Sequence, residues 1–306
     1  PVGDWRLTDC AIMMWSVLIA VCIASVGADE PGEAGCEACL RVDGACYNLT
    51  HIAELQAPFR NQIVIPKMAV LHNKNTLYYT FEPTITDSEY YKVGFIHLDN
   101  TNNSGVILAD KRNFNFGTFD IDQDNNDIYL GGSNGIYMLS ANDDRLTPYS
   151  SLGDTIISIF FKGFVYFVRS GENKIIQKRA DNFIEYLEDD TVKNFVINKN
   201  YIIIYLSTRG LYASTKGSPY SAMETVLLSK NSFFRGLTVD AEGTVYAWWV
   251  DGIYKVTIEE KLSSSRIDKV AHIPNIGAMT FDKQNNILFT SAKKLYRLSK
   301  TTFKDC

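Results

Sequence analysis

The sequence predicts an all-β fold, and three observations support this. Aromatic residues make up 12% of the 306-residue chain, as expected of β-structure. Short runs of β-branched and aromatic residues alternate with turns rich in Asp, Asn and Gly. A phrase of three such runs recurs along the chain with its internal order kept, which indicates a repeat architecture.

The clearest copy of the repeat is Phe234–Val256, with the sequence FRGLTVDAEGTVYAWWVDGIYKV. Its three short apolar runs are separated by an Asp-Ala-Glu-Gly turn and an Asp-Gly turn. They predict a three-stranded antiparallel meander, which a fourth strand at about Asp268–His272 would complete. Four strands in about 40 residues match the size of one propeller blade.

Five further copies of the phrase predict six blades in all. They are Met68–Phe81, Asn115–Leu139, Ile157–Val168, Phe195–Ala213 and Asn275–Leu298. The aromatic residue of the second strand falls at Tyr78, Tyr129, Tyr166, Tyr205, Tyr246 and Phe289. We therefore predict a six-bladed β-propeller; the alternative is a β-sandwich whose strands only share turn chemistry.

A ring of blades has to close, and we expect an N-terminal strand to complete the last blade, which has only three strands of its own. Gln62–Met68 resembles Ala271–Ile276, because both reach an Ile-Pro just before an inner strand. We therefore expect Gln62–Ile65 to be the missing fourth strand, beside Lys294–Leu298. The expected organisation is a leader (1–28), a Cys-containing segment (29–61) and the propeller (62–306).

Residues 1–28 have the features of a secretory leader. Met13 and Met14 precede the apolar run Trp15–Val26, which leads to small residues ending at Ala28. A membrane-spanning helix needs about 20 apolar residues, so we expect a signal peptide cleaved after Ala28 rather than an uncleaved anchor. The sequence thus predicts a secreted, extracellular protein.

The charge pattern limits the partners that this chain is expected to have. The formal net charge is −5, and no basic stripe occurs in the sequence. These features argue against nucleic acid or an anionic membrane as a partner of the mature protein. The oligomeric state is left open.

Removal of the leader takes away Cys10 and Cys22 and leaves an even number of cysteines, as expected of a secreted chain with disulfides. The remaining cysteines are Cys36, Cys39, Cys46 and Cys306. Ring closure predicts a bridge from Cys306 to one of the other three, although the sequence does not select which. A zinc or redox role for Cys36-x-x-Cys39 lacks a second CxxC or a His pair at ligand spacing.

Two sequons, at Asn48 and Asn102, predict glycosylation sites. We expect Asn102 to lie in the loop that lengthens the first blade. The four histidines, His51, His72, His97 and His272, have no partner at a spacing that would suggest catalysis or metal binding.

Two motifs resemble functional sites but favour turns. Gly131–Gly135 fits the G-x-S-x-G pattern of serine hydrolases, which requires a strand-to-helix elbow, whereas here it joins two short strands. Asp120–Asp127 resembles a calcium loop, but Asn125 replaces the required Gly and Gly131 the required Glu. We interpret both as polar hairpin turns.

Polar residues just ahead of the inner strands are expected to converge on the mouth of the central channel. These residues are Asn115, Asp154, Asn194 and Asn275. In this place they could form the calcium site of a propeller lactonase or esterase. The alternative is that Asn and Asp are simply good turn formers.

Aromatic and arginine side chains are expected at the same end of the ring, where they would stack on a flat ligand and pair with its carboxylates. Phe114 and Phe233 belong to this group, and the residues predicted to bind ligand are Phe116, Arg169, Arg209, Phe234, Arg235 and Trp249. The alternative is that these side chains pack between blades.

The leader, the Cys36/Cys39/Cys46 segment, Gln62–Pro66 and the blade sequence DIYLGGSNGIYML together resemble the insect ommochrome-binding proteins, secreted proteins of lepidopteran haemolymph. The resemblance implies a non-enzymatic protein that binds a planar pigment with amino-acid carboxylates, such as xanthommatin, without a cofactor. Two alternatives remain: a calcium-dependent lactonase or esterase, and an extracellular protein-binding propeller. The Tyr-Trp-Thr-Asp phrase common in the latter is only faintly matched by Tyr78–Phe81.

Overall fold

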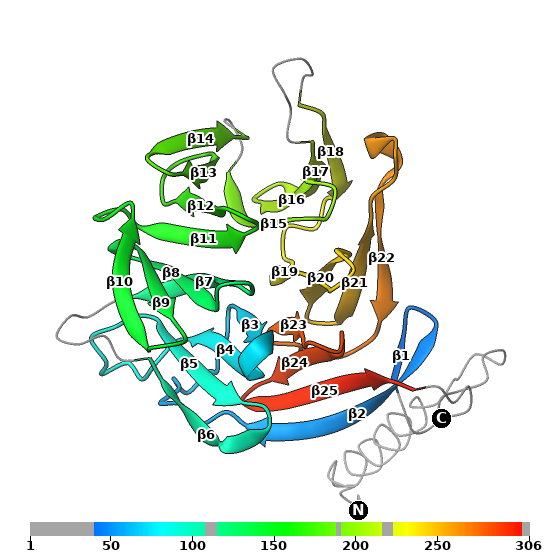
Figure 1. Ribbon diagram of the computed structural model, residues 1–306. Coiled ribbons are helices and arrows are strands. Elements are labelled where there is room, and N and C mark those ends of the chain that lie inside the picture. The colour runs from blue at the N-terminus through cyan, green and yellow to red at the C-terminus, as the bar shows by residue number, and fades with distance from the viewer. Residues whose placement is uncertain (1–39, 108–114, 188–190, 216–222, 302–306) are drawn as a thin grey trace, which may run out of the picture. The chain divides into compact units, whose positions relative to one another are not determined.

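The computed structural model describes residues 40–107, 115–187, 191–215 and 223–301. These residues form six antiparallel sheets arranged as the blades of a β-propeller, which confirms the predicted fold class (Figure 1). The predicted leader, Phe114, Cys36, Cys39 and Cys306 lie outside the described residues. Among the described residues, no helix is long and apolar enough to cross a membrane.

The first two strands of each blade lie nearest the channel. The innermost strands are β3 (Met68–Leu71), β7 (Phe116–Asp122), β11 (Ile156–Phe161), β15 (Val192–Ile197), β19 (Gly236–Val239) and β23 (Met279–Phe281). The second strands are β4 (Thr76–Phe81), β8 (Asp127–Gly132), β12 (Val165–Arg169), β16 (Ile203–Ser207), β20 (Val245–Trp249) and β24 (Ile287–Ser291). Each predicted second-strand aromatic residue lies on one of these second strands.

The remaining strands form the outer part of the blades. The third strands are β5 (Lys92–His97), β9 (Gly135–Ser140), β13 (Ile175–Arg179), β17 (Gly210–Ser214), β21 (Gly252–Thr257) and β25 (Lys294–Lys300). The outer strands are β6 (Asn100–Val106), β10 (Arg145–Ser150), β14 (Asn182–Tyr186), β18 (Thr225–Ser229), β22 (Arg266–Ala271) and β2 (Ala45–Glu54). A short strand β1 (Leu40–Val42) adds to β2, and two 3-10 turns, η1 (His72–Lys74) and η2 (Leu262–Ser264), lie in connections.

The hydrophobic core is divided among the interfaces between neighbouring blades. Tyr129 of the second blade stacks on Phe161 of the third, with ring centroids 5.4 Å apart. Tyr246 of the fifth blade lies 5.2 Å from Phe281 of the sixth. Burial of such a ring stabilises the fold by roughly 1.5–3 kcal/mol, which explains why this position is aromatic in every copy.

The last blade is completed by an N-terminal strand, as predicted, but this strand is β2. The prediction that Gln62–Ile65 closes the ring is wrong. Tyr47 to Glu54 pair antiparallel with Lys300 to Lys294 of β25. The propeller therefore begins well before residue 62, within the segment expected to precede it.

The segment around Gln62–Ile65 instead belongs to the interface between the first and last blades. Val64 accepts a hydrogen bond from the Glu82 amide, at 3.3 Å, and Ile65 is buried in the core that also contains Leu298. Its apolar residues are thus used in packing. The ten-residue β2 supplies a longer edge for pairing with β25 than this short Pro-terminated run.

The hairpin that joins β1 to β2 also contacts the fifth blade. Its turn residues Asp43 and Gly44 both have positive φ, 50° and 75°, as required by a tight two-residue hairpin. The Asp43 amide donates to the Val270 carbonyl at 2.9 Å, and its carboxylate pairs with Lys255 at 2.6 Å. The N-terminal hairpin therefore joins the fifth and sixth blades.

Cys46 on β2 is disulfide-bonded, and the Thr301 amide donates to its carbonyl at 3.0 Å. Thr301, which directly follows β25, thus lies beside Cys46. Cys36, Cys39 and Cys306 lie outside the described residues, so the disulfide partner of Cys46 remains a prediction.

The structure forms turns at both predicted positions, and both sequon asparagines are exposed. Gly135 has a φ of 98° and begins β9 directly after the tight turn at Ser133 and Asn134. Asp122 accepts the Asp124 amide at 3.0 Å in the turn that had resembled a calcium loop. Asn48 and Asn102 are exposed, but Asn102 lies on β6 and not in a loop.

We predict that prolines at both Leu49 and Thr50 will destabilise the ring. Adjacent strand residues point their N–H groups in opposite directions, so one of the two prolines removes a hydrogen bond to β25. The free energy of unfolding should fall by about 1–3 kcal/mol. Each kcal/mol lowers Tm by roughly 2–4 °C, which calorimetry can measure. The control Gln62→Pro changes an exposed residue outside the strands and should alter Tm little; the reverse ranking would contradict closure by β2.

Candidate functional site

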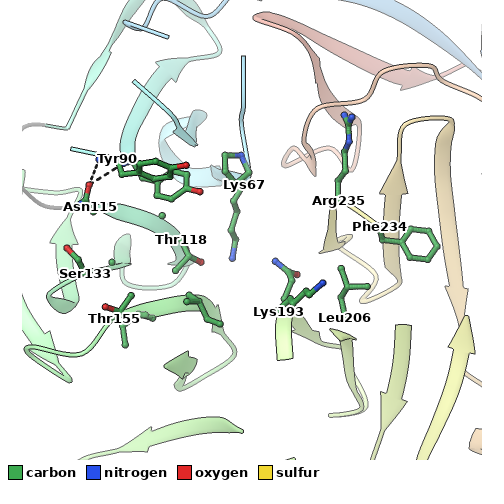
Figure 2. A pocket seen from close by; sticks show the side chains of 17 residues that line it. Lys67, Tyr90, Asn115, Thr118, Ser133, Thr155, Lys193, Leu206, Phe234 and Arg235 are labelled. Carbon is green, nitrogen blue, oxygen red and sulfur yellow. Dashed lines mark hydrogen bonds between the residues drawn. The ribbon is translucent and has the colours of Figure 1, made fainter. Parts of the chain in front are cut away.

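A cavity of about 520 Å³ opens at the face of the ring where the chain enters the inner strands (Figure 2). Its volume is within the range of sites that enclose a small organic molecule. The lining residues are Pro66, Lys67, Tyr90, Tyr91, Asn115, Gly117, Thr118, Gly132, Ser133, Thr155, Ile156, Ile157, Lys193, Asn194, Leu206, Phe234 and Arg235. They come from the first five blades.

Three consecutive inner strands carry a β-bulge where they pass this cavity. The pairing of β7 with β8 skips Gly117, that of β11 with β12 skips Ile157, and that of β15 with β16 skips Lys193. A bulge locally redirects a side chain out of the alternating pattern of a strand. All three skipped residues line the cavity, so the bulges determine what its wall presents.

Positive charge dominates the lining. Lys67, Lys193 and Arg235 line the cavity, whereas none of the described lining residues is acidic. The whole chain has a net charge of −5, so this concentration of cations is local. Low-dielectric walls lined by one sign of charge attract ligands of the opposite sign.

Lys67 is the innermost of these cations. It lines this cavity and also a second one of about 300 Å³ within the central channel, so it borders both. Its Nζ donates to the Ile159 carbonyl at 2.8 Å and lies 3.9 Å from an Asp120 carboxylate oxygen. Burial lowers the pKa of Lys67 and raises that of Asp120, since both charges are removed from water.

The long connection between β4 and β5 supplies an aromatic wall. Tyr90 and Tyr91 lie edge to face, with ring centroids 4.8 Å apart, and the Tyr91 ring covers Gly117 so closely that a Cβ there would lie 3.1 Å from it. Arg60 lies over the Tyr90 ring at 5.0 Å and pairs with Glu82 at 3.1 Å. Burial and the Glu82 charge raise the pKa of Tyr91, which keeps its hydroxyl neutral.

Asn115 and Asn194 of the predicted polar ring both line the cavity. The Asn115 side-chain oxygen accepts the backbone amides of Tyr90 and Tyr91, so it holds the aromatic wall in place (Figure 2). The Asn194 side-chain oxygen is buried and has no hydrogen-bond partner among the residues that the structure describes. An unpaired buried acceptor is costly, and a ligand N–H near it would remove that cost.

The other two members of the polar ring do not line the cavity. Asp154 forms an ion pair with Arg169 at 3.0 Å, and Asn275 lies exposed on the connection between β22 and β23. No group of three or more His, Cys, Asp or Glu residues suited to a metal occurs in the described part of the chain. The cavity therefore contains two of the four polar residues that were expected to meet there, Asn115 and Asn194.

The six predicted ligand-binding residues are divided between the cavity and other positions. Phe234 and Arg235 line the cavity. The Phe234 ring is 5% exposed and packs edge-on against Tyr254, and Figure 2 shows it directed away from Lys67. The Arg235 guanidinium donates to the Ile276 carbonyl at 2.6 Å.

Phe116, Arg169, Arg209 and Trp249 are not among the lining residues. Phe116 is 5% exposed and packs against Tyr137, and Trp249 packs against the core between the fourth and fifth blades. Arg169 is held by Asp154 and Glu172, and Arg209 is exposed in the turn between β16 and β17. Phe116 and Trp249 are thus packed into the core, in line with the alternative interpretation of these aromatic residues.

Sequence reasoning missed Lys67, Lys193, Tyr90, Tyr91 and Thr118. Lys193 directly precedes Asn194, a predicted member of the polar ring. The bulge that places Lys193 in the cavity wall cannot be predicted from the repeat. Tyr90 and Tyr91 lie in the connection between β4 and β5, which is longer than the corresponding connection of every other blade, and this extra length was the available signal. The fold brings these residues together from two inner strands, β7 and β15, and from the connections that precede β3 and β5.

The fold and the cavity define a six-bladed β-propeller with a ligand-sized, cation-lined cavity at one end of its channel. No protein-family model matches the chain. The chain is similar to the ommochrome-binding protein of Manduca sexta, with 21% identity over 231 residues, which cover 74% of this chain and 80% of the relative.

Solved propellers are similar in fold at much lower identity. A gluconolactonase from Xanthomonas campestris aligns with a TM-score of 0.61 and 13% identity, over 86% of this chain and 92% of its own. The virginiamycin B lyase of Staphylococcus aureus aligns with a TM-score of 0.54 and 11% identity, over 83% and 100%. The WD40 domain of Doa1 aligns with a TM-score of 0.52 and 12% identity, over 84% and 98%. These similarities show the shared propeller architecture.

His72 lines the channel cavity at the junction of the first, second and sixth blades. Its backbone amide donates to the Gln123 side chain at 3.0 Å. Burial lowers the pKa of its imidazole, an effect that the nearby Asp282 and the Phe281 backbone only partly offset. The folded protein therefore binds a proton at His72 less readily than the unfolded chain does.

We predict that His72 makes stability fall in mild acid. The unfolded imidazole gains its proton near pH 6.5 and the folded one only at lower pH. The stabilisation of the folded protein that comes from neutral His72 is therefore complete above pH 6.5, and it decreases as the pH falls below this value. His72→Gln should lose less stability than the wild type between pH 7.5 and 5.5, measured by urea unfolding. The exposed His272→Gln is the control; equal losses in the wild type and His72→Gln would refute the assignment.

Proposed function

We propose that this protein is a secreted, non-enzymatic carrier that binds a planar, anionic aromatic pigment of the ommochrome type non-covalently. The observation that carries the proposal is the cavity of about 520 Å³ whose described lining includes three cations, two tyrosines and aliphatic side chains but no carboxylate. The similarity to the ommochrome-binding protein of Manduca sexta supports the same ligand class.

The walls and charges of the cavity suit such a ligand. Tyr91 offers a ring face, and Ile157 and Leu206 offer apolar surface against which a flat ring system would pack. Lys67 and Lys193 offer ammonium groups for carboxylates, and the unpaired Asn194 oxygen offers an acceptor for an amino group. A pigment that carries amino-acid side chains has all three complementary parts.

Secretion is part of the same proposal. It is supported by the leader-like residues 1–28, by the disulfide of Cys46 and by the exposure of both sequon asparagines, Asn48 and Asn102. Disulfides persist in oxidising, extracellular compartments. A haemolymph carrier would meet these conditions.

Titration of the purified protein with xanthommatin tests the proposal through the visible spectrum of the pigment and the quenching of Trp fluorescence. We expect saturable binding in the micromolar range or tighter. Tyr91→Ala should weaken it about tenfold, because a stacking contact and its buried area are lost. Arg209→Ala is the control, since Arg209 does not line the cavity. An unperturbed spectrum at tens of micromolar pigment would count against the proposal.

A calcium-dependent lactonase or esterase is the second candidate, because Asn115 and Asn194 line one cavity. We favour the carrier, since Asp154, the acidic member of the expected ring, is paired with Arg169. Pigment affinity should therefore be unchanged by a calcium chelator, and a panel of lactones should not be hydrolysed when calcium is added. Calcium-dependent lactone hydrolysis that is lost in Asn194→Ala would reverse this choice.

A further inference from the structure

We propose that Lys67, with Thr118 beside it, is the anion anchor at the floor of the cavity, so that the pigment enters with a carboxylate first and its rings nearer the rim. This inference rests on the proposed function and specifies the orientation and charge of the ligand. The observations that support it are the position of Lys67, its unused hydrogen-bond donors, and the exposure and direction of Lys193 and Arg235.

The position of Lys67 makes it the floor of the cavity. Its side chain lines both the mouth cavity and the channel cavity, whereas Lys193 and Arg235 line the mouth only and are exposed. Figure 2 shows the Lys67 side chain reaching into the space between Thr118 and Lys193. A ligand group that passes the rim therefore meets the Lys67 ammonium last.

Lys67 has hydrogen-bonding capacity to spare. An ammonium group has three donors, and one is used at 2.8 Å on the Ile159 carbonyl. Asp120 is 3.9 Å away, beyond hydrogen-bond length, and its other oxygen accepts the Phe161 amide at 2.6 Å. Among the described residues, Asp120 thus balances the charge of Lys67 but accepts none of its hydrogen bonds. The remaining donors can bind the carboxylate of a ligand reversibly.

Thr118 is held next to this ammonium by the same backbone unit. The Ile159 amide donates to the Thr118 hydroxyl oxygen at 3.2 Å, while the Ile159 carbonyl accepts from Lys67. Among the described residues the Thr118 hydroxyl accepts this bond and has no acceptor for its own proton, so that proton can be donated to a ligand. One residue of β11 therefore positions both donors, and a carboxylate can take one hydrogen bond from each.

The other cations are less suited to this task. One of the five N–H donors of Arg235 binds the Ile276 carbonyl at 2.6 Å, and Figure 2 shows the guanidinium pointing away from Lys67 and Lys193. Lys193 is exposed on its bulge, where solvent weakens its attraction for an anion. We assign these two residues to attraction of the ligand at the mouth and Lys67 to its anchoring.

The test compares xanthommatin with its methyl ester on the wild type, Lys67→Met, Lys67→Arg and Lys193→Met. The wild type should bind the acid about tenfold to a hundredfold more tightly than the ester, because a charge-assisted hydrogen bond is lost. Lys67→Met should bind both forms with the weaker affinity, Lys67→Arg should recover part of the preference, and Lys193→Met should keep most of it. Thermal unfolding of each variant controls for folding.

The outcomes separate this inference from the proposed function. If the wild type binds the acid and the ester equally, or if Lys193→Met and not Lys67→Met removes the preference, the anchor is overturned while pigment binding stands. If the wild type binds neither form, the proposed function fails and the anchor fails with it. Should Lys67→Met not fold, the comparison of acid and ester on the wild type and Lys67→Arg still decides the question.

Discussion

The pairing of β2 with β25 is the constraint on which the rest of the molecule depends. Every inner strand packs between two neighbours, and this arrangement is complete only when the last blade meets the first. The buried residues Ile65 and Leu298 belong to one core that spans this junction. Because the cavity walls come from strands and connections of five different blades, they keep their spacing only while the ring is closed.

Within the closed ring, small local irregularities determine the chemistry of the cavity. The bulges at Gly117, Ile157 and Lys193 each turn one residue out of the regular alternation. At the first, the absence of a side chain admits the Tyr91 ring; at the others an apolar group and a cation are presented. One repeated backbone feature thus produces three different kinds of wall, and this suits a ligand with both flat apolar and anionic parts.

The sequence predicted the blades better than it predicted their closure. The aromatic position of the second strand recurs because each blade has the same neighbour-packing problem, so it can be read from the chain. The choice between Gln62–Ile65 and β2 is different, since both contain apolar residues near the start of the propeller. It depends on which of them pairs with β25 and which fills the interface between blades, and that competition involves residues more than 200 positions away.

By itself, the sequence determined an all-β repeat, the number of blades, the positions of the turns and the general end of the ring where polar and aromatic residues gather. These features depend on periodicity and turn chemistry, which are local. Only the tertiary structure decided which of those residues share a cavity: Arg235 and Asn194 do, whereas Arg169 is drawn into an ion pair with Asp154. It also revealed Lys67, whose importance comes from its place between two cavities, because burial and the distances between side chains are set by the packing of the whole ring.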